Sequence, residues 1–89
     1  MHSRPIMVVD DDDDVRNMLC AVLAAEGYPV VSAADGVEAL THMRNDPPAL
    51  AVVDMMMPRM DGEELIRAMA QDAALVRVPV AIMSGQTTP

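Results

Sequence analysis

The chain has almost no aromatic residues and little positive charge. Only one of its 89 residues is aromatic, and six Lys and Arg stand against fourteen Asp and Glu. The net charge of −8 argues against nucleic-acid binding, because contacts to phosphate depend on Lys and Arg. A surface this acidic favours cations or a basic patch on a partner protein.

Cysteine and long hydrophobic runs are also scarce. Cys20 is the only cysteine, which excludes a disulfide framework. The N-terminal residues lead into an apolar run of only four residues, 6–9, which is too short for a signal peptide or a membrane span. We therefore expect a soluble, cytoplasmic protein without a membrane partner.

What the chain does have is aliphatic apolar side chains. Hydrophobic residues make up 52% of the sequence, and ten of them are Met, which packs adaptably. A chain of this length forms one domain at most and buries about 60–65% of its unfolded surface. We expect residues 1–89 to form that domain.

Short apolar runs alternate with segments of helical periodicity. The apolar runs predict four strands, at residues 6–9, 28–33, 50–54 and 79–83. This alternation predicts parallel strands joined by right-handed crossovers, and therefore an α/β fold. Pro29 cannot donate to a strand ladder, so the second strand is expected at an edge of the sheet or paired on one side near its start.

The three predicted helices have clear ends. The first begins after Asp12 or Asp13 and ends before Gly27, which suits a left-handed cap. The second, 36–44, follows Asp35, with Glu38 placed close to a capping-box position; the third, 62–71, follows another Asp. Their expected core positions are Val15, Met18, Leu19, Val22 and Leu23; Val37, Leu40 and Met43; and Leu65, Ile66 and Met69.

Polar residues follow three of the predicted strands. Asp10 and Asp11 come after the first, Asp54 ends the third and Ser84 follows the fourth. If the first and third strands are neighbours, their carboxylates lie about 5–6 Å apart and repel by about 3 kcal/mol. A hard divalent ion such as Mg²⁺ relieves this repulsion, and a carboxylate beside it is suited to accept a phosphoryl group.

The segment from Asp54 to Gly62, with Met-Pro and Asp-Gly after the first Asp, is specific. Together with Asp10-Asp11 and Ser84-Gly85, it resembles the receiver domain of response regulators in two-component signalling. The resemblance covers residues 5–89. It implies a flavodoxin-like parallel sheet in the order 2-1-3-4.

The resemblance also assigns roles to single residues. It implies that Asp54 is the phosphoacceptor, that Asp11 binds Mg²⁺ directly, and that Asp10 acts on the metal mainly through water. The backbone carbonyl of Met56 completes the protein ligands, and Ser84 contacts a phosphoryl oxygen. Met56 and Gln86 stand where the family tunes the lifetime of the phosphorylated state.

The sequence departs from the family after Ser84. The family continues with a helix, a strand that carries a phosphate-binding Lys, and a last helix; here no Lys or Arg follows Ser84. We expect a receiver truncated after its fourth strand, or a piece of a longer protein. The fourth strand is then an exposed edge, which predicts a homodimer through residues 79–84.

The implied function is that of a signalling protein and not an enzyme. A sensor histidine kinase or phosphotransfer protein would phosphorylate Asp54 in the presence of Mg²⁺. The alternative is a receiver-like interaction or dimerisation module that is not phosphorylated. A hydrolase with an aspartyl-phosphate intermediate would need a second Asp at position 56, where Met stands, and an EF-hand would need Gly in place of Val15.

Overall fold

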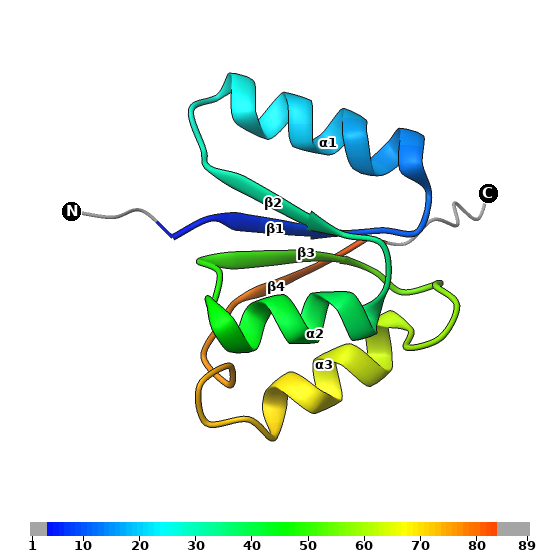
Figure 1. Ribbon diagram of the computed structural model, residues 1–89, viewed down its shortest axis with the longest axis vertical. Coiled ribbons are helices and arrows are strands. Elements are labelled where there is room, and N and C mark those ends of the chain that lie inside the picture. Colours follow the sequence, from blue (N-terminus) through cyan, green and yellow to red (C-terminus); the bar gives the residue numbers. More distant parts are fainter. Residues whose placement is uncertain (1–3, 84–89) are drawn as a thin grey trace.

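The computed structural model describes residues 4–83, and the predicted roles of Ser84 and Gln86 therefore lie outside the described residues. Strands and helices alternate along the chain (Figure 1). The elements are β1 (Ile6–Val9), α1 (Asp13–Ala25), β2 (Val30–Ala33), α2 (Gly36–Asn45), β3 (Leu50–Asp54), α3 (Gly62–Ala70) and β4 (Val80–Met83). The predicted bounds agree within one residue, except that β2 begins at Val30 and not at Tyr28.

The four strands form one parallel sheet in the order β2-β1-β3-β4, as predicted. In this sheet β1 pairs with β3 so that Val9 lies opposite Val53. The carboxyl ends of these two strands therefore meet at the same edge. β2 is an edge strand, as Pro29 predicts, and the Pro29 carbonyl still accepts a hydrogen bond of 2.9 Å from the Ile6 N–H.

The core lies between the sheet and the two helices on one of its faces, α2 and α3 (Figure 1). Inward-facing strand residues meet apolar residues of both helices there. The buried members of this core are Met7, Val9, Ala33, Ala39, Leu40, Met43, Ala51, Val53, Met57, Leu65, Met69 and Leu75. Alternate residues of each strand face this core, as the two-residue period of a strand requires.

The opposite face carries α1, and here the predicted core positions were partly wrong. No residue of α1 is fully buried, and Met18 and Val22 are 57% and 55% exposed. Within residues 4–83, α1 is the only helix on its face of the sheet (Figure 1), so only its inner side packs against strands. On α2 the expected core residue Val37 is 44% exposed and Ala39 is buried instead. The buried face of this helix consists of Gly36, Ala39, Leu40 and Met43.

Helix ends follow the local sequence closely. Asp12 is the N-cap of α1, and its side chain accepts hydrogen bonds from the N–H groups of Asp14 and Val15. Gly27 has a φ of 95°, and the helix ends with the Schellman pair of hydrogen bonds, Tyr28 N–H to the Leu23 carbonyl and Gly27 N–H to the Ala24 carbonyl. The left-handed cap predicted at Gly27 is therefore present.

The other two N-caps differ in one detail. Asp61 and Glu64 form a complete capping box at α3. At α2 the Asp35 side chain accepts from the Glu38 N–H as expected, but the Glu38 carboxylate accepts from the N–H of Ala34 and not from that of Asp35. The capping box at α2 is thus only half realised, because the glutamate is hydrogen-bonded to the N–H of Ala34 instead of that of the N-cap.

Among residues 4–83, no helix combines the length and the apolar character needed to cross a membrane.

The N-cap of α3 provides a test of this local reading. Asp61→Ala removes the acceptor for the Glu64 N–H and should lower the free energy of unfolding by about 1 kcal/mol. Asp61→Asn keeps an oxygen acceptor and should retain most of the stability. Urea unfolding followed by circular dichroism measures both, and equal losses in the two variants would contradict the capping role.

Candidate functional site

Three carboxylates meet where β1 and β3 end. Asp10 and Asp11 directly follow β1, and Asp54 is the last residue of β3. One oxygen from each of the three lies within 4.8 Å of the others. The structure therefore brings together the three acidic residues singled out in the sequence, because parallel pairing of adjacent strands places their carboxyl ends side by side.

Asp10 is the buried member of this acidic cluster, which comprises Asp10, Asp11 and Asp54. It is 4% exposed, and its Oδ1 accepts a hydrogen bond of 2.9 Å from the Asp12 N–H. Burial raises the pKa of Asp10 above its ordinary value, and the negative charges of Asp54, Asp11 and Asp12 raise it further. The hydrogen bond from Asp12 lowers this pKa but does not cancel the rise.

Arg16 is a neighbour of the cluster that the sequence analysis did not single out. Its Nη1 donates a 2.8 Å hydrogen bond to the backbone carbonyl of Asp10, and its Nη2 pairs with the Asp13 carboxylate. It thus holds the turn between β1 and α1. An Arg two residues after an Asp run is common near the start of a helix, so the sequence carried no signal for this contact.

No basic side chain within residues 4–83 neutralises the acidic cluster. The four ion pairs of this part of the chain join Arg16 to Asp13, Arg44 to Asp72, Arg59 to Asp35 and Arg67 to Glu63. None of them includes Asp10, Asp11 or Asp54. No ion pair within residues 4–83 therefore offsets the negative charge of these carboxylates, and this favours a bound cation.

The loop after β3 contacts the third carboxylate. Asp54 is half-buried, and its Oδ1 accepts a 3.0 Å hydrogen bond from the N–H of Met56. The side chain of Met56 is 74% exposed, whereas Met57 is buried in the core. Of these two neighbouring methionines, only Met57 packs into the core.

The donor set of the cluster fits a hard divalent ion. All three groups are carboxylates, and Mg²⁺ prefers octahedral oxygen ligands at about 2.0–2.1 Å, which places adjacent ligands about 3 Å apart and opposite ligands about 4 Å apart. The three oxygens lie within 4.8 Å of one another, somewhat wider than these separations. The cluster could therefore hold Mg²⁺ after a small closing movement of its side chains.

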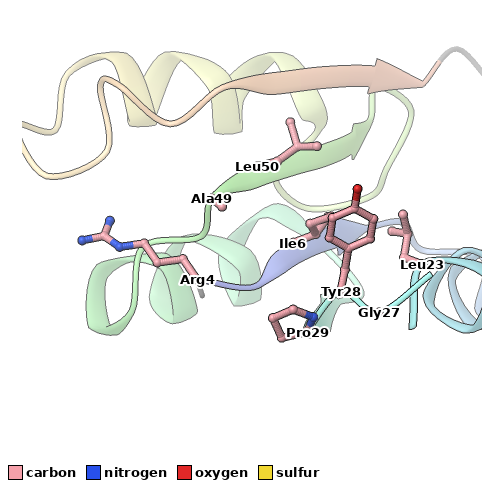
Figure 2. A pocket seen from close by; sticks show the side chains of 8 residues that line it. All are labelled: Arg4, Ile6, Leu23, Gly27, Tyr28, Pro29, Ala49 and Leu50. Atoms are coloured by element: carbon pink, nitrogen blue, oxygen red, sulfur yellow. The ribbon is translucent and has the colours of Figure 1, made fainter. Parts of the chain in front are cut away.

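An apolar hollow of about 740 Å³ lies elsewhere in the molecule (Figure 2). Ile6 and Leu50, the first residues of β1 and β3, line it together with Leu23 and Tyr28, and Arg4 lies at one end of it in this view. It thus opens at the amino ends of the strands, whereas the acidic cluster lies at their carboxyl ends. The hollow takes no part in the candidate site.

Removing the buried charge should stabilise the protein when no metal is bound. Because the pKa of Asp10 is raised by folding, the folded state holds the proton more tightly, and stability falls as the pH rises from 3.8 through the raised pKa. In EDTA, Asp10→Asn should therefore raise the melting temperature at pH 7. The gain should shrink near pH 4, and an equal gain at both pH values would contradict this origin.

Comparison with known proteins agrees with this geometry. Residues 6–89 match the family described as the response regulator receiver domain. The chain is 35% identical over 86 residues to hybrid signal transduction histidine kinase D of Dictyostelium discoideum, covering 97% of this chain and 6% of that protein. It is 33% identical over 84 residues to the response regulator GtcR of Aneurinibacillus migulanus, covering 94% of this chain and 34% of the relative.

Solved structures show the same similarity. The chemotaxis response regulator CheY4 of Vibrio cholerae superposes with a TM-score of 0.90 at 30% identity, over 99% of this chain and 73% of that one. This chain thus spans about a third or less of the two curated relatives and about three quarters of the solved one. The fold, the acidic cluster and the family match together establish that the chain belongs to the response regulator receiver domains of two-component signal transduction.

Proposed function

We propose that Asp54 accepts a phosphoryl group from a sensor histidine kinase or a phosphotransfer protein, in a reaction that depends on Mg²⁺. The observation that carries this proposal is the convergence of the Asp10, Asp11 and Asp54 carboxylates within 4.8 Å in a receiver fold. Asp10, Asp11, Asp54 and the backbone carbonyl of Met56 are the protein ligands in this proposal. Bound there, the ion would offset the negative charge that develops on the transferring oxygens.

We assign separate roles in the phosphoryl transfer to Met56, Asp54 and Ser84. The hydrogen bond from the Met56 N–H orients Asp54 through Oδ1, so we assign Oδ2 as the attacking oxygen. Its bond to phosphorus forms as the bond between phosphorus and the donor breaks, and the donor keeps the electron pair. Ser84, outside the described residues, is proposed to donate to a phosphoryl oxygen.

In this proposal the domain is a signalling protein and not an enzyme with a substrate of its own. Phosphorylation changes the charge at one edge of the sheet, and a partner reads that change. We place the reaction in the cytoplasm, where a kinase can reach the acidic edge. The acidic composition, with fourteen Asp and Glu, supports a protein partner with a basic surface and not a nucleic acid.

Phosphorylation can be tested with acetyl phosphate and Mg²⁺. Intact-protein mass spectrometry should show the addition of one phosphoryl group, and EDTA should prevent it. Asp54→Asn should abolish the addition because the attacking oxygen is lost. Asp61→Asn is the matched control: it removes a carboxylate of the same loop but keeps an acceptor for the helix cap, and it should still be phosphorylated. Addition to Asp54→Asn at the wild-type level would refute the assignment.

The alternative function, an interaction module that dimerises, has its own support. Within residues 4–83, β4 pairs only with β3, and Ala81 and Ile82 are exposed, the latter by 58%. Residues 78–83 carry no charge, so two copies can approach here without bringing acidic side chains together. We propose that a second copy pairs with this edge about a two-fold axis, so that the two β4 strands hydrogen-bond to each other.

Light scattering coupled to size-exclusion chromatography tests this dimer. At tens of micromolar the wild type should elute as a dimer, and Ile82→Lys should shift it to a monomer because two like charges would then face each other across the edge. Val37→Lys, which places the same charge on an exposed residue of α2, should remain dimeric. A monomeric wild type would contradict the proposal.

A further inference from the structure

The loop from β3 to α3, residues 55–61, determines how Asp54 is presented. Its first contact with the acceptor is the hydrogen bond from the Met56 N–H to Asp54 Oδ1, at 3.0 Å. It ends at the N-cap Asp61, and the following Gly62 lies so close to β3 that a Cβ there would be 2.6 Å from the Asp54 carbonyl oxygen. A change in the path of this loop would therefore move the hydrogen-bond donor of Asp54.

The N-terminus of α2 holds the middle of this loop. The Arg59 guanidinium lies 3.1 Å from Asp35 Oδ2, and the Gly36 N–H donates a 3.1 Å hydrogen bond to the Met60 carbonyl. Asp35 uses its two oxygens separately, since Oδ1 accepts the capping hydrogen bond from the Glu38 N–H. One carboxylate thus both caps α2 and binds the loop, although Asp35 and Arg59 are 24 positions apart in the sequence.

Two backbone features show that this contact constrains the loop closely. A Cβ at Gly36 would lie 2.5 Å from the Met60 carbonyl oxygen, so any side chain there would push the loop away. Arg59 has a φ of 68°, the only positive value of a non-glycine residue within residues 4–83. A residue keeps such a conformation only when its surroundings over-determine it. The contacts with α2 hold Arg59 in this conformation.

We propose that Asp35, Gly36 and Arg59 are positioning residues for the phosphoacceptor. They act on Asp54 through the loop: α2 holds Arg59 and Met60, which fixes the path of residues 55–58 and so places the Met56 N–H at Asp54. The same path also fixes the position of the Met56 backbone relative to the acidic cluster. This role rests on the proposed function of Asp54, but its structural part exists without phosphorylation.

Amide hydrogen exchange of Met56, measured by NMR in the metal-free protein, tests the structural part. Arg59→Met should speed exchange at Met56 and weaken Mg²⁺ binding, measured by calorimetry, by about two- to fivefold, the range expected of an exposed ion pair. Arg59→Lys should restore most of both. Asp35→Asn, which keeps the cap of α2, should behave as Arg59→Met does. The double variant should change Met56 exchange and Mg²⁺ affinity no more than either single variant does. Gly36→Ala should have the larger effect, about tenfold on Mg²⁺ binding, because the whole loop is displaced.

Arg67→Met is the matched control, because Arg67 also makes an exposed ion pair, 3.6 Å from Glu63, but on α3. It should leave Met56 exchange and Mg²⁺ affinity unchanged. Wild-type exchange and affinity in Arg59→Met, Asp35→Asn and Gly36→Ala would overturn the proposal. If Gly36→Ala does not fold, the Arg59 and Asp35 variants decide. If the wild type takes up no phosphoryl group while Met56 exchange responds as described, the positioning stands and only the proposed function of Asp54 fails.

Discussion

Repulsion among three carboxylates at one edge of the sheet is the constraint on which the site depends. With oxygens within 4.8 Å of one another, each charged pair costs about 3 kcal/mol at an effective dielectric constant near 20. The fold accepts this cost because the residues just before Asp10 and Asp54, Val9 and Val53, are fully buried in the core. Packing below this edge thus holds the three carboxylates closer together than their repulsion favours. A bound cation or a proton relieves that repulsion.

The two faces of the sheet contribute unequally to this support. The face covered by α2 and α3 contains the whole buried core cluster, whereas α1 on the other face has no fully buried residue. The site therefore rests on the better packed half of the domain. Exposed large apolar side chains include Met18 and Val22 on α1 and Ile82 on β4, and such residues are places where contacts with another chain can form.

All three helices begin at the same edge, because each follows a strand of the parallel sheet. The N-caps Asp12, Asp35 and Asp61 satisfy the first N–H groups of these helices, and the positive ends of the helix dipoles face the acidic side of the molecule. At Asp35 capping and loop contact are combined in one carboxylate. The capped helix N-termini and the candidate site therefore lie at the same edge of the sheet.

The sequence by itself determined the elements, their order and the acidic edge. The caps at Asp12, Gly27 and Asp61 and the apolar run that ends at Asp54 are local signals, and in a parallel α/β sheet the ends of successive strands fall on one side. Only the tertiary structure decided which residues face inward and which distant segments meet. Met18 and Val22 have the period of a core stripe yet remain exposed, and Arg59 reaches Asp35 from 24 positions away. Periodicity and capping act over a few residues, whereas burial and long-range pairing depend on which elements pack against each other in space.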